Sequence, residues 1–173
     1  MGDRLYTGTI HLVETKKPVV IKEHLIVGNT NNTLASVYRA TDQTGLADTV
    51  WTKVALDTEF FDVGSNFASN TYTVPITGYY LLTWGATFTT SAGGNHLVDA
   101  QSGIFVGGVA TGRNGSMHNG PGIAFYISSG SCIINLTAGN AVTLYATGST
   151  DDASTTTILG GGYTRLDVML VSQ

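Results

Sequence analysis

The stretch of sequence that decides the fold is GYYLLTW, residues 78–84. Successive side chains of a β-strand point to opposite faces of its sheet. One face of this predicted strand carries Tyr80, Leu82 and Trp84. The other face carries Tyr79 and Leu81, so both faces are apolar. An antiparallel strand beside a single core normally alternates apolar and polar residues, and the second apolar face therefore needs a cover of its own.

The C-terminal segment RLDVMLV, residues 165–171, repeats this pattern with Met169 and Val171 on its second face. A symmetric partner subunit is one cover for such a face. The N-terminal segment or a loop of the same chain is the alternative. We expect an oligomer that covers one of the two apolar faces of these strands.

The remainder of the chain favours short strands over helices. No long segment repeats apolar residues at helical spacing, and Gly, Asn, Asp and Ser separate short β-like segments. The expected strands are Ala35–Ala40, Val50–Leu56, Thr71–Val74, Gly78–Thr90, Gly103–Val109, Gly122–Ser128, Ser131–Leu136, Ala141–Thr147 and Tyr163–Val171. Eight or nine strands at a spacing of roughly 8–12 residues indicate an all-β sandwich or jelly roll.

The first 33 residues differ from the rest. Leu5–Val13 and Pro18–Val27 form two predicted extended segments, and the polar stretch GNTNNT, residues 28–33, follows them. We therefore divide the chain into an N-terminal β arm, residues 1–33, and a compact domain, residues 34–173. The apolar residues with which the arm would attach to a partner are Leu5, Ile10, Leu12, Val19, Ile21 and Leu25.

The composition narrows the classes of partner. Charged residues make up 12% of the chain, against about 25% in ordinary globular proteins, which indicates large buried or shared surfaces. The net charge of -4 argues against nucleic acid as a partner. No stretch approaches the ~20 apolar residues that span a bilayer, and the N-terminus lacks the apolar core of a secretory signal.

The sequence contains no recognisable catalytic motif, and we expect a non-enzymatic protein without cofactor or metal. The four histidines lie far apart, and the pair Asp151-Asp152 supplies too few ligands for calcium unless a trimer triples it. Cys132, the single cysteine, lies in an apolar strand and is expected to be an inert thiol. Gly160–Gly162 has no following Lys-Ser/Thr, which a phosphate-binding loop would require.

The segment Ser91–Gly122 is rich in Gly, Ser and Asn and is expected to form exposed loops around a short strand. Loops on rigid β scaffolds often carry recognition. We take His96, Arg113 and His118 as the candidate recognition residues, and His96 and His118 as residues that a trimer apex would bring together.

Residues 56–84 resemble the signature of the complement 1q family: a large apolar residue, a spaced Asp, two aromatics, then Gly-x-Tyr-x-Phe-x-aromatic. The matching residues are Leu56, Asp62, Phe67, Tyr72, Gly78, Tyr80, Leu82 and Trp84. Leu56, Tyr72 and Leu82 stand where the family has Phe, and the gap between the two aromatics is two residues shorter. LTAGNAVTL, residues 136–144, resembles the family's Leu-x-x-Gly-Asp-x-Val-x-Leu, with Asn140 for Asp.

This resemblance, which covers roughly residues 35–171, implies a ten-strand jelly roll of the complement 1q/tumour-necrosis-factor type that packs as a trimer about an axis. It directs Tyr79 and Leu81 toward that axis, so the predicted interface residues are Tyr79, Leu81, Met169 and Val171. The core that it implies contains Phe67, Tyr72, Tyr80, Leu82, Trp84 and Leu144.

Three segments, residues 37–40, 49–54 and 57–62, are similar to the version of this module in bacteriophage structural proteins. There the module is a trimeric fibre head, a receptor-binding tip or a capsid decoration. The resemblance implies a homotrimeric virion surface protein, with capsid decoration favoured and the arm bound to a major capsid or tail protein by strand addition. The alternative is a receptor- or glycan-binding head of a tail fibre or a cell-surface module.

Overall fold

The computed structural model describes residues 33–92, 94–114 and 118–173. For residues 112–114 and 118–121 it describes the backbone alone. The predicted arm, with all six of its proposed attachment residues, lies outside the described residues except for Thr33. The backbone oxygen of Thr33 accepts a hydrogen bond from the Leu170 N–H at 3.0 Å, so this last residue of the predicted arm joins the compact domain.

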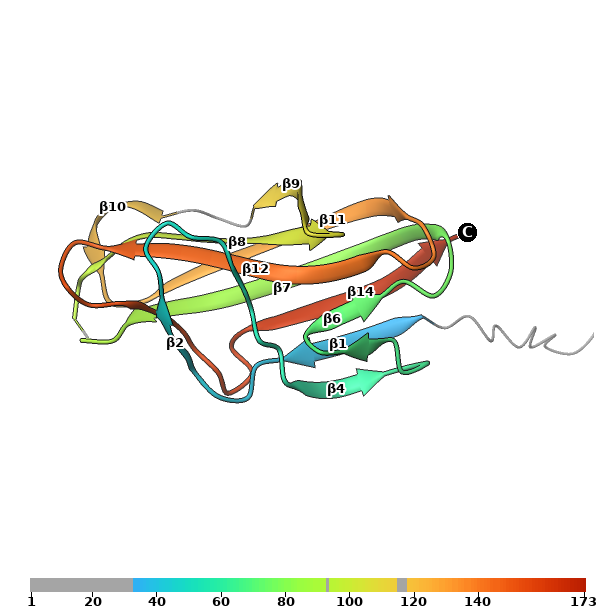
Figure 1. The fold of residues 1–173 in the computed structure, drawn as a ribbon, viewed down its shortest axis with the longest axis horizontal. Coiled ribbons are helices and arrows are strands. Elements are labelled where there is room, and N and C mark those ends of the chain that lie inside the picture. The colour runs from blue at the N-terminus through green and yellow to red at the C-terminus, as the bar shows by residue number, and fades with distance from the viewer. Residues whose placement is uncertain (1–32, 93, 115–117) are drawn as a thin grey trace, which may run out of the picture. The chain divides into compact units, whose positions relative to one another are not determined.

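The described part of the chain is a sandwich of two antiparallel sheets (Figure 1), and the expected all-β jelly roll is confirmed. The first layer, here called the β7 sheet, contains β1 (Leu34–Tyr38), β2 (Gln43–Leu46), β4 (Thr58–Asp62), β7 (Gly78–Thr90), β11 (Tyr126–Leu136), β13 (Thr156–Ile158) and β14 (Arg165–Ser172). The second layer, the β12 sheet, contains β3 (Thr52–Lys53), β5 (Phe67–Ala68), β6 (Thr71–Thr73), β8 (Leu97–Val106), β9 (Val109–Asn114), β10 (His118–Ile123) and β12 (Ala141–Thr150). No membrane-spanning helix is found among these described residues.

Strand β7 is the centre of its sheet. β11 pairs along one of its edges, and β14 and β13 share the other. β14 then continues the sheet through β1 to β4. The observed bounds of β7 are those expected from the sequence, because its two apolar faces and its β-branched and aromatic residues all favour a strand.

The core lies between the two sheets and takes one face of β7. Tyr80, Leu82 and Trp84 are at most 2% exposed. From the β12 sheet, Tyr72 and Leu144 are fully buried, and Phe67 packs against this core while half-buried. Burial raises the pKa of the Tyr72 phenol, and that of Tyr80 as well.

Strand β11 corrects one expectation from the sequence. Gly122–Ser128 and Ser131–Leu136 were predicted as separate strands, but β11 runs without a break through Ser129 and Gly130. Gly130 pairs with Trp84, and a Cβ added to Gly130 would overlap the indole ring. The glycine that resembled a turn signal is therefore the residue that lets a large core side chain lie against a continuous strand.

Candidate subunit interface

A row of apolar side chains crosses the outer face of the β7 sheet. The strand registers place Leu34 of β1 opposite Met169 of β14, Met169 opposite Leu81 of β7, and Leu81 opposite Ile133 of β11. Directly opposed residues of an antiparallel pair lie on the same face. Ile133 is 63% exposed and Met169 is 41% exposed. We call these four residues the apolar row.

The predicted interface residues all belong to this region. Leu81 and Met169 lie in the apolar row, and Tyr79 and Val171, each about half exposed, lie beside it on the same two strands. Leu34 and Ile133 were missed by the sequence analysis. A signal for Ile133 was available, because the run from Cys132 to Ile134 is apolar on both faces in the same way as β7.

The next row on the same face, two residues further along β7, is polar. It contains Thr83, Asp167 and Ser36, which the registers place opposite one another. The Ser36 hydroxyl donates to Asp167 Oδ1 at 2.5 Å, and Arg165 Nε lies 3.5 Å from Asp167 Oδ2. A hollow of about 310 Å³ lies over the two rows and is lined in part by Phe61, which is 49% exposed. The outer face thus joins an apolar band to a hydrogen-bonded polar band.

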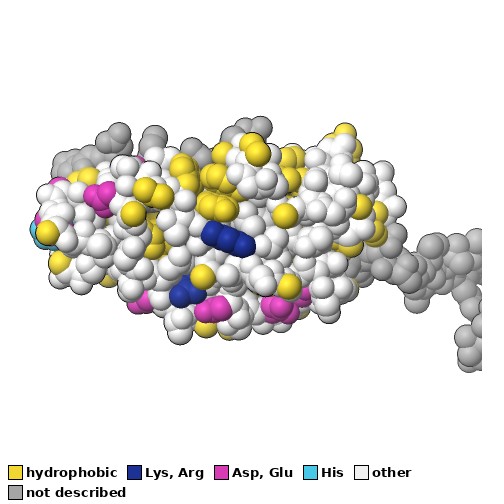
Figure 2. Space-filling view, in the orientation of Figure 1, with side chains coloured by type: hydrophobic (Ala, Val, Ile, Leu, Met, Phe, Trp, Pro, Cys, Tyr) yellow, Lys and Arg dark blue, Asp and Glu magenta, His cyan; other side chains and the backbone are white. Residues whose placement is uncertain are grey.

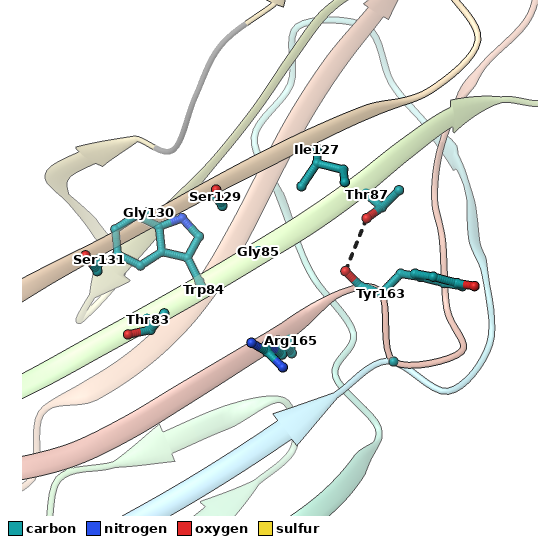
Figure 3. Close-up of a pocket in the computed structure, with 11 residues that line it drawn as sticks. Thr83, Trp84, Gly85, Thr87, Ile127, Ser129, Gly130, Ser131, Tyr163 and Arg165 are labelled. Carbon is teal, nitrogen blue, oxygen red and sulfur yellow. Dashed lines mark hydrogen bonds between the residues drawn. The ribbon is translucent and has the colours of Figure 1, made fainter.

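A second hollow, of about 520 Å³, opens farther along the same face (Figure 3). Its lining includes Thr83, Thr87, Ile127, Ser129, Ser131, Tyr163 and Arg165. Gly85 leaves room here because it has no side chain, and Figure 3 shows the Trp84 ring beside the strand that carries Gly130. The Thr87 hydroxyl donates to the Tyr163 carbonyl at 3.2 Å.

The outer face of the β12 sheet is different. Trp51, Phe105 and Tyr145 form a group of half-buried aromatic rings there, with Phe105 and Tyr145 stacked at 4.2 Å and Trp51 tilted against Phe105 at 5.5 Å. Lys53 is fixed by hydrogen bonds from its Nζ to the Ser69 carbonyl and the Thr71 hydroxyl. Figure 2 shows how few charged side chains interrupt the face in view, where hydrophobic side chains gather.

The predicted recognition residues do not form a single loop. Arg113 belongs to β9 and His118 begins β10, whereas both were expected in exposed loops. The reason is strand pairing, because β9 and β10 both pair with β8 and extend the sheet. The side chains of Arg113 and His118 lie outside the described residues, so their expected approach to His96 stays a prediction.

His96 lies next to two carboxylates that the sequence analysis treated separately. Its Nδ1 is 3.0 Å from Asp151 Oδ1 and 3.2 Å from Asp152 Oδ2. Hydrogen bonds from the Ser154 hydroxyl and N–H lower the pKa of Asp152. Nothing in the sequence indicated that this histidine and the acidic pair lie side by side. Strand pairing between β8 and β12 brings residues 55 positions apart together.

Comparison with known proteins shows the fold. No protein-family model matches the sequence, and no curated protein matches it either. Among solved structures, the globular domain of zebrafish complement 1qA protein superposes with a TM-score of 0.51 at 14% identity, over 82% of this chain and 98% of that chain. The chain has the fold of a complement 1q globular domain.

The structure gives physical reasons for two residues of the complement 1q-like signature. Asp62 Oδ2 accepts a hydrogen bond from the Phe67 N–H at 2.7 Å and so closes the turn between β4 and β5. Gly78 begins β7 where a Cβ would overlap the Ser172 carbonyl of β14. Both residues fix the approach to the strand whose two faces carry the core and the apolar row.

Proposed function

We propose that this protein is a non-enzymatic homotrimeric virion surface protein, most specifically a phage capsid decoration protein that its N-terminal arm attaches to the particle. The observation that carries the proposal is the apolar row on the outer face of a complement 1q-type sandwich. The virion role rests on the sequence resemblance of residues 37–40, 49–54 and 57–62 to phage structural proteins.

The apolar row supports a subunit interface because its side chains are aligned across four strands and two of them, Met169 and Ile133, remain 41% and 63% exposed. Exposed apolar patches on soluble proteins mark interaction sites. Burying such side chains contributes about 25 cal/mol for each Å² removed from water. The polar row beside it contains Asp167, which Arg165 approaches. These charges would set the register between subunits, because misplaced charges at an interface are costly.

Two features support a particle-bound role. The three phage-like segments include β1, β3 and β4, so they belong to the folded scaffold. The chain is also poor in charge, at 12%, as expected for a protein that shares much of its surface. In this proposal the arm, residues 1–33, adds a strand to a major capsid or tail protein, which is a common attachment mode for extended segments.

The trimer is tested by light scattering. A chain of 18.1 kDa predicts a native mass of about 54 kDa for three copies, for the full chain and for a version that begins at Thr33. A monomeric mass for both would overturn the trimer. The virion role is tested separately by locating the protein on native particles with labelled antibody, and its absence from purified particles would overturn that role.

The alternative, a receptor- or glycan-binding head, is favoured by a different observation. The group of Trp51, Phe105 and Tyr145 presents aromatic rings on the outer face of the β12 sheet, and aromatic faces stack on apolar faces of ligands. A glycan array with the full chain tests this function. Binding that a Trp51→Ala variant loses would support the alternative, and an array without any binding would remove it.

A further inference from the structure

The end of the sandwich at which β8 begins and β12 ends holds three candidate metal ligands. One ligand atom from each of His96, Asp151 and Asp152 lies within 4.8 Å of the other two. All three side chains reach solvent, with exposed fractions of 40%, 48% and 33%. The cluster lies within one chain and contains no residue of the apolar row.

The backbone holds these residues together. Thr150 pairs with Leu97, and the Asp151 N–H donates to the His96 carbonyl at 3.0 Å, so the ladder between the strands continues into the cluster. Gly122 of β10 packs so closely against this segment that a Cβ would overlap the Asn95 carbonyl. His96 is therefore fixed between neighbouring strands on both sides.

Asp152 is oriented by its own partners. Its Oδ1 accepts hydrogen bonds from the Ser154 N–H at 2.9 Å and from the Ser154 hydroxyl at 2.5 Å. These bonds leave Oδ2 directed at His96 Nδ1, 3.2 Å away. A ligand held by a second shell of hydrogen bonds loses less freedom when it binds a metal.

We propose that His96, Asp151 and Asp152 bind one divalent transition-metal ion, such as Zn²⁺, in each chain. Bonds from such an ion to imidazole nitrogen and carboxylate oxygen are about 2.1 Å long, which places neighbouring ligands about 3.4 Å apart around a tetrahedral ion such as Zn²⁺ and about 3.0 Å apart around an octahedral one. The separations from Nδ1 to the two carboxylates, 3.0 and 3.2 Å, fall within this range. Rotation of an exposed carboxylate adjusts the remaining oxygen–oxygen separation.

The ligand set selects the class of metal. One imidazole with two carboxylates suits Zn²⁺, Co²⁺ or Ni²⁺, whereas Ca²⁺ takes six to eight oxygen ligands. Three protein ligands leave the remaining positions to water. The competing interpretation is a hydrogen bond from an Nδ1–H of His96 to the carboxylates, because a hydrogen on Nδ1 occupies the place that the metal would take.

Isothermal titration of the full chain with ZnCl₂ tests the proposal. We expect one ion per chain at the cluster, and we expect His96→Gln and Asp151→Asn each to weaken that binding about tenfold or more, since each removes one of three ligands. Glu59→Gln, which removes an exposed carboxylate on β4, is the matched control and should bind as the native chain does. Native mass and circular dichroism check that each variant is folded.

Three results would overturn the metal site. One is the absence of zinc binding to the folded chain. Another is zinc binding that His96→Gln leaves unchanged, since the ion would then lie elsewhere. The third concerns the class of metal: CaCl₂ that competes with zinc at equal concentration would contradict a nitrogen-containing site. Each result is independent of whether the protein is a trimer or lies on a virion.

Discussion

The two outer faces of the sandwich both carry large apolar side chains, but these side chains cover one another on only one of the two faces. On the β12 sheet, Trp51, Phe105 and Tyr145 pack against one another, so the chain itself covers much of their surface. On the β7 sheet, Met169 and Ile133 stand in a row with their neighbours and remain 41% and 63% exposed. Grouped rings shield one another from water within one chain, whereas the exposed side chains of the apolar row are shielded only when a second molecule packs against them.

Apolar side chains on an outer face can therefore contribute either to the folding of one chain or to its assembly with others. A stacked aromatic pair contributes about 0.5–1.5 kcal/mol beyond its buried area, and this gain belongs to the folding of one chain. The apolar row gains little until another molecule covers it. The first group should therefore govern the stability of the single chain, and the second its assembly.

The largest expected effect is the loss of the trimer on Leu81→Asp. An unpaired charge in the centre of a buried interface costs several kcal/mol, and symmetry repeats that cost at every subunit contact. Light scattering should show the native mass falling from about 54 kDa to the 18.1 kDa of one chain. Val109→Asp, which places the same charge at a 67% exposed position of the β12 sheet, should leave the trimer intact. A trimeric Leu81→Asp variant would contradict the role of the apolar row.

The next largest effect is expected for Gly130→Ala, which acts beneath the same face. The added Cβ would overlap the Trp84 ring, and overpacking of a core costs about 1–3 kcal/mol. Urea unfolding at fixed protein concentration should measure this loss of free energy of unfolding. Gly85→Ala is the control, because its Cβ would meet nothing closer than the Ser129 Cβ at 3.9 Å. Equal losses in the two variants would contradict the close packing at Gly130.

A smaller effect is expected for Phe105→Leu, which keeps an apolar side chain but removes the stacked ring. The free energy of unfolding should fall by about 0.5–1.5 kcal/mol, with the native mass unchanged. Ile133→Ser provides the reverse test, since it should weaken the trimer and change the unfolding of the single chain little. If Phe105→Leu dissociates the trimer, the assignment of the two faces is reversed.

The smallest effect is expected at Asp57, which directly precedes β4 and is 38% exposed. The Ala40 N–H lowers the pKa of this carboxyl, with further contributions from Thr58 and Arg39. A lowered pKa in the folded state stabilises the protein above the ordinary value of about 3.9, and this contribution is lost as the pH falls through the folded pKa. Asp57→Asn should therefore lower the melting temperature slightly at pH 6 and less at pH 3. A difference that grows in acid would contradict this sign.

The sequence predicted those features of the fold that depend on the residue pattern of a single strand. The bounds of β7 and its division into two apolar faces followed from alternation, which is local. The resemblance to the complement 1q family then assigned Tyr80, Leu82 and Trp84 to the core, where they are buried. Strand β11 was divided wrongly because Gly130 resembles a turn residue until Trp84 is placed opposite it. The strands β2, β4, β5, β9 and β13 were missed. The short strands β2 and β13 show no periodicity in their few residues, and each depends on a partner far along the chain.

The residues of the candidate interface likewise divide into those that a local pattern predicts and those that depend on strand register. The pattern of each strand grouped Tyr79 with Leu81 and Met169 with Val171, and the resemblance to the complement 1q family selected these faces as the interface. Leu34 completes the row only through the register between β1 and β14, which no local pattern fixes. The cluster of His96 with Asp151 likewise depends on the pairing of β8 with β12, across 55 positions. Local patterns predict faces, and only strand register predicts which side chains meet.

The glycine at position 130 has a consequence for spectroscopy. The chain contains two tryptophans. Trp84 lies in the core, where its ring packs against Gly130, and Trp51 lies on the outer face of the other sheet. Their fluorescence will therefore sense different surroundings: a chain that keeps Trp84 alone reports on the core, and one that keeps Trp51 alone reports on the outer face of the β12 sheet. Emission from the two chains can then follow core packing and ligand contact as separate signals.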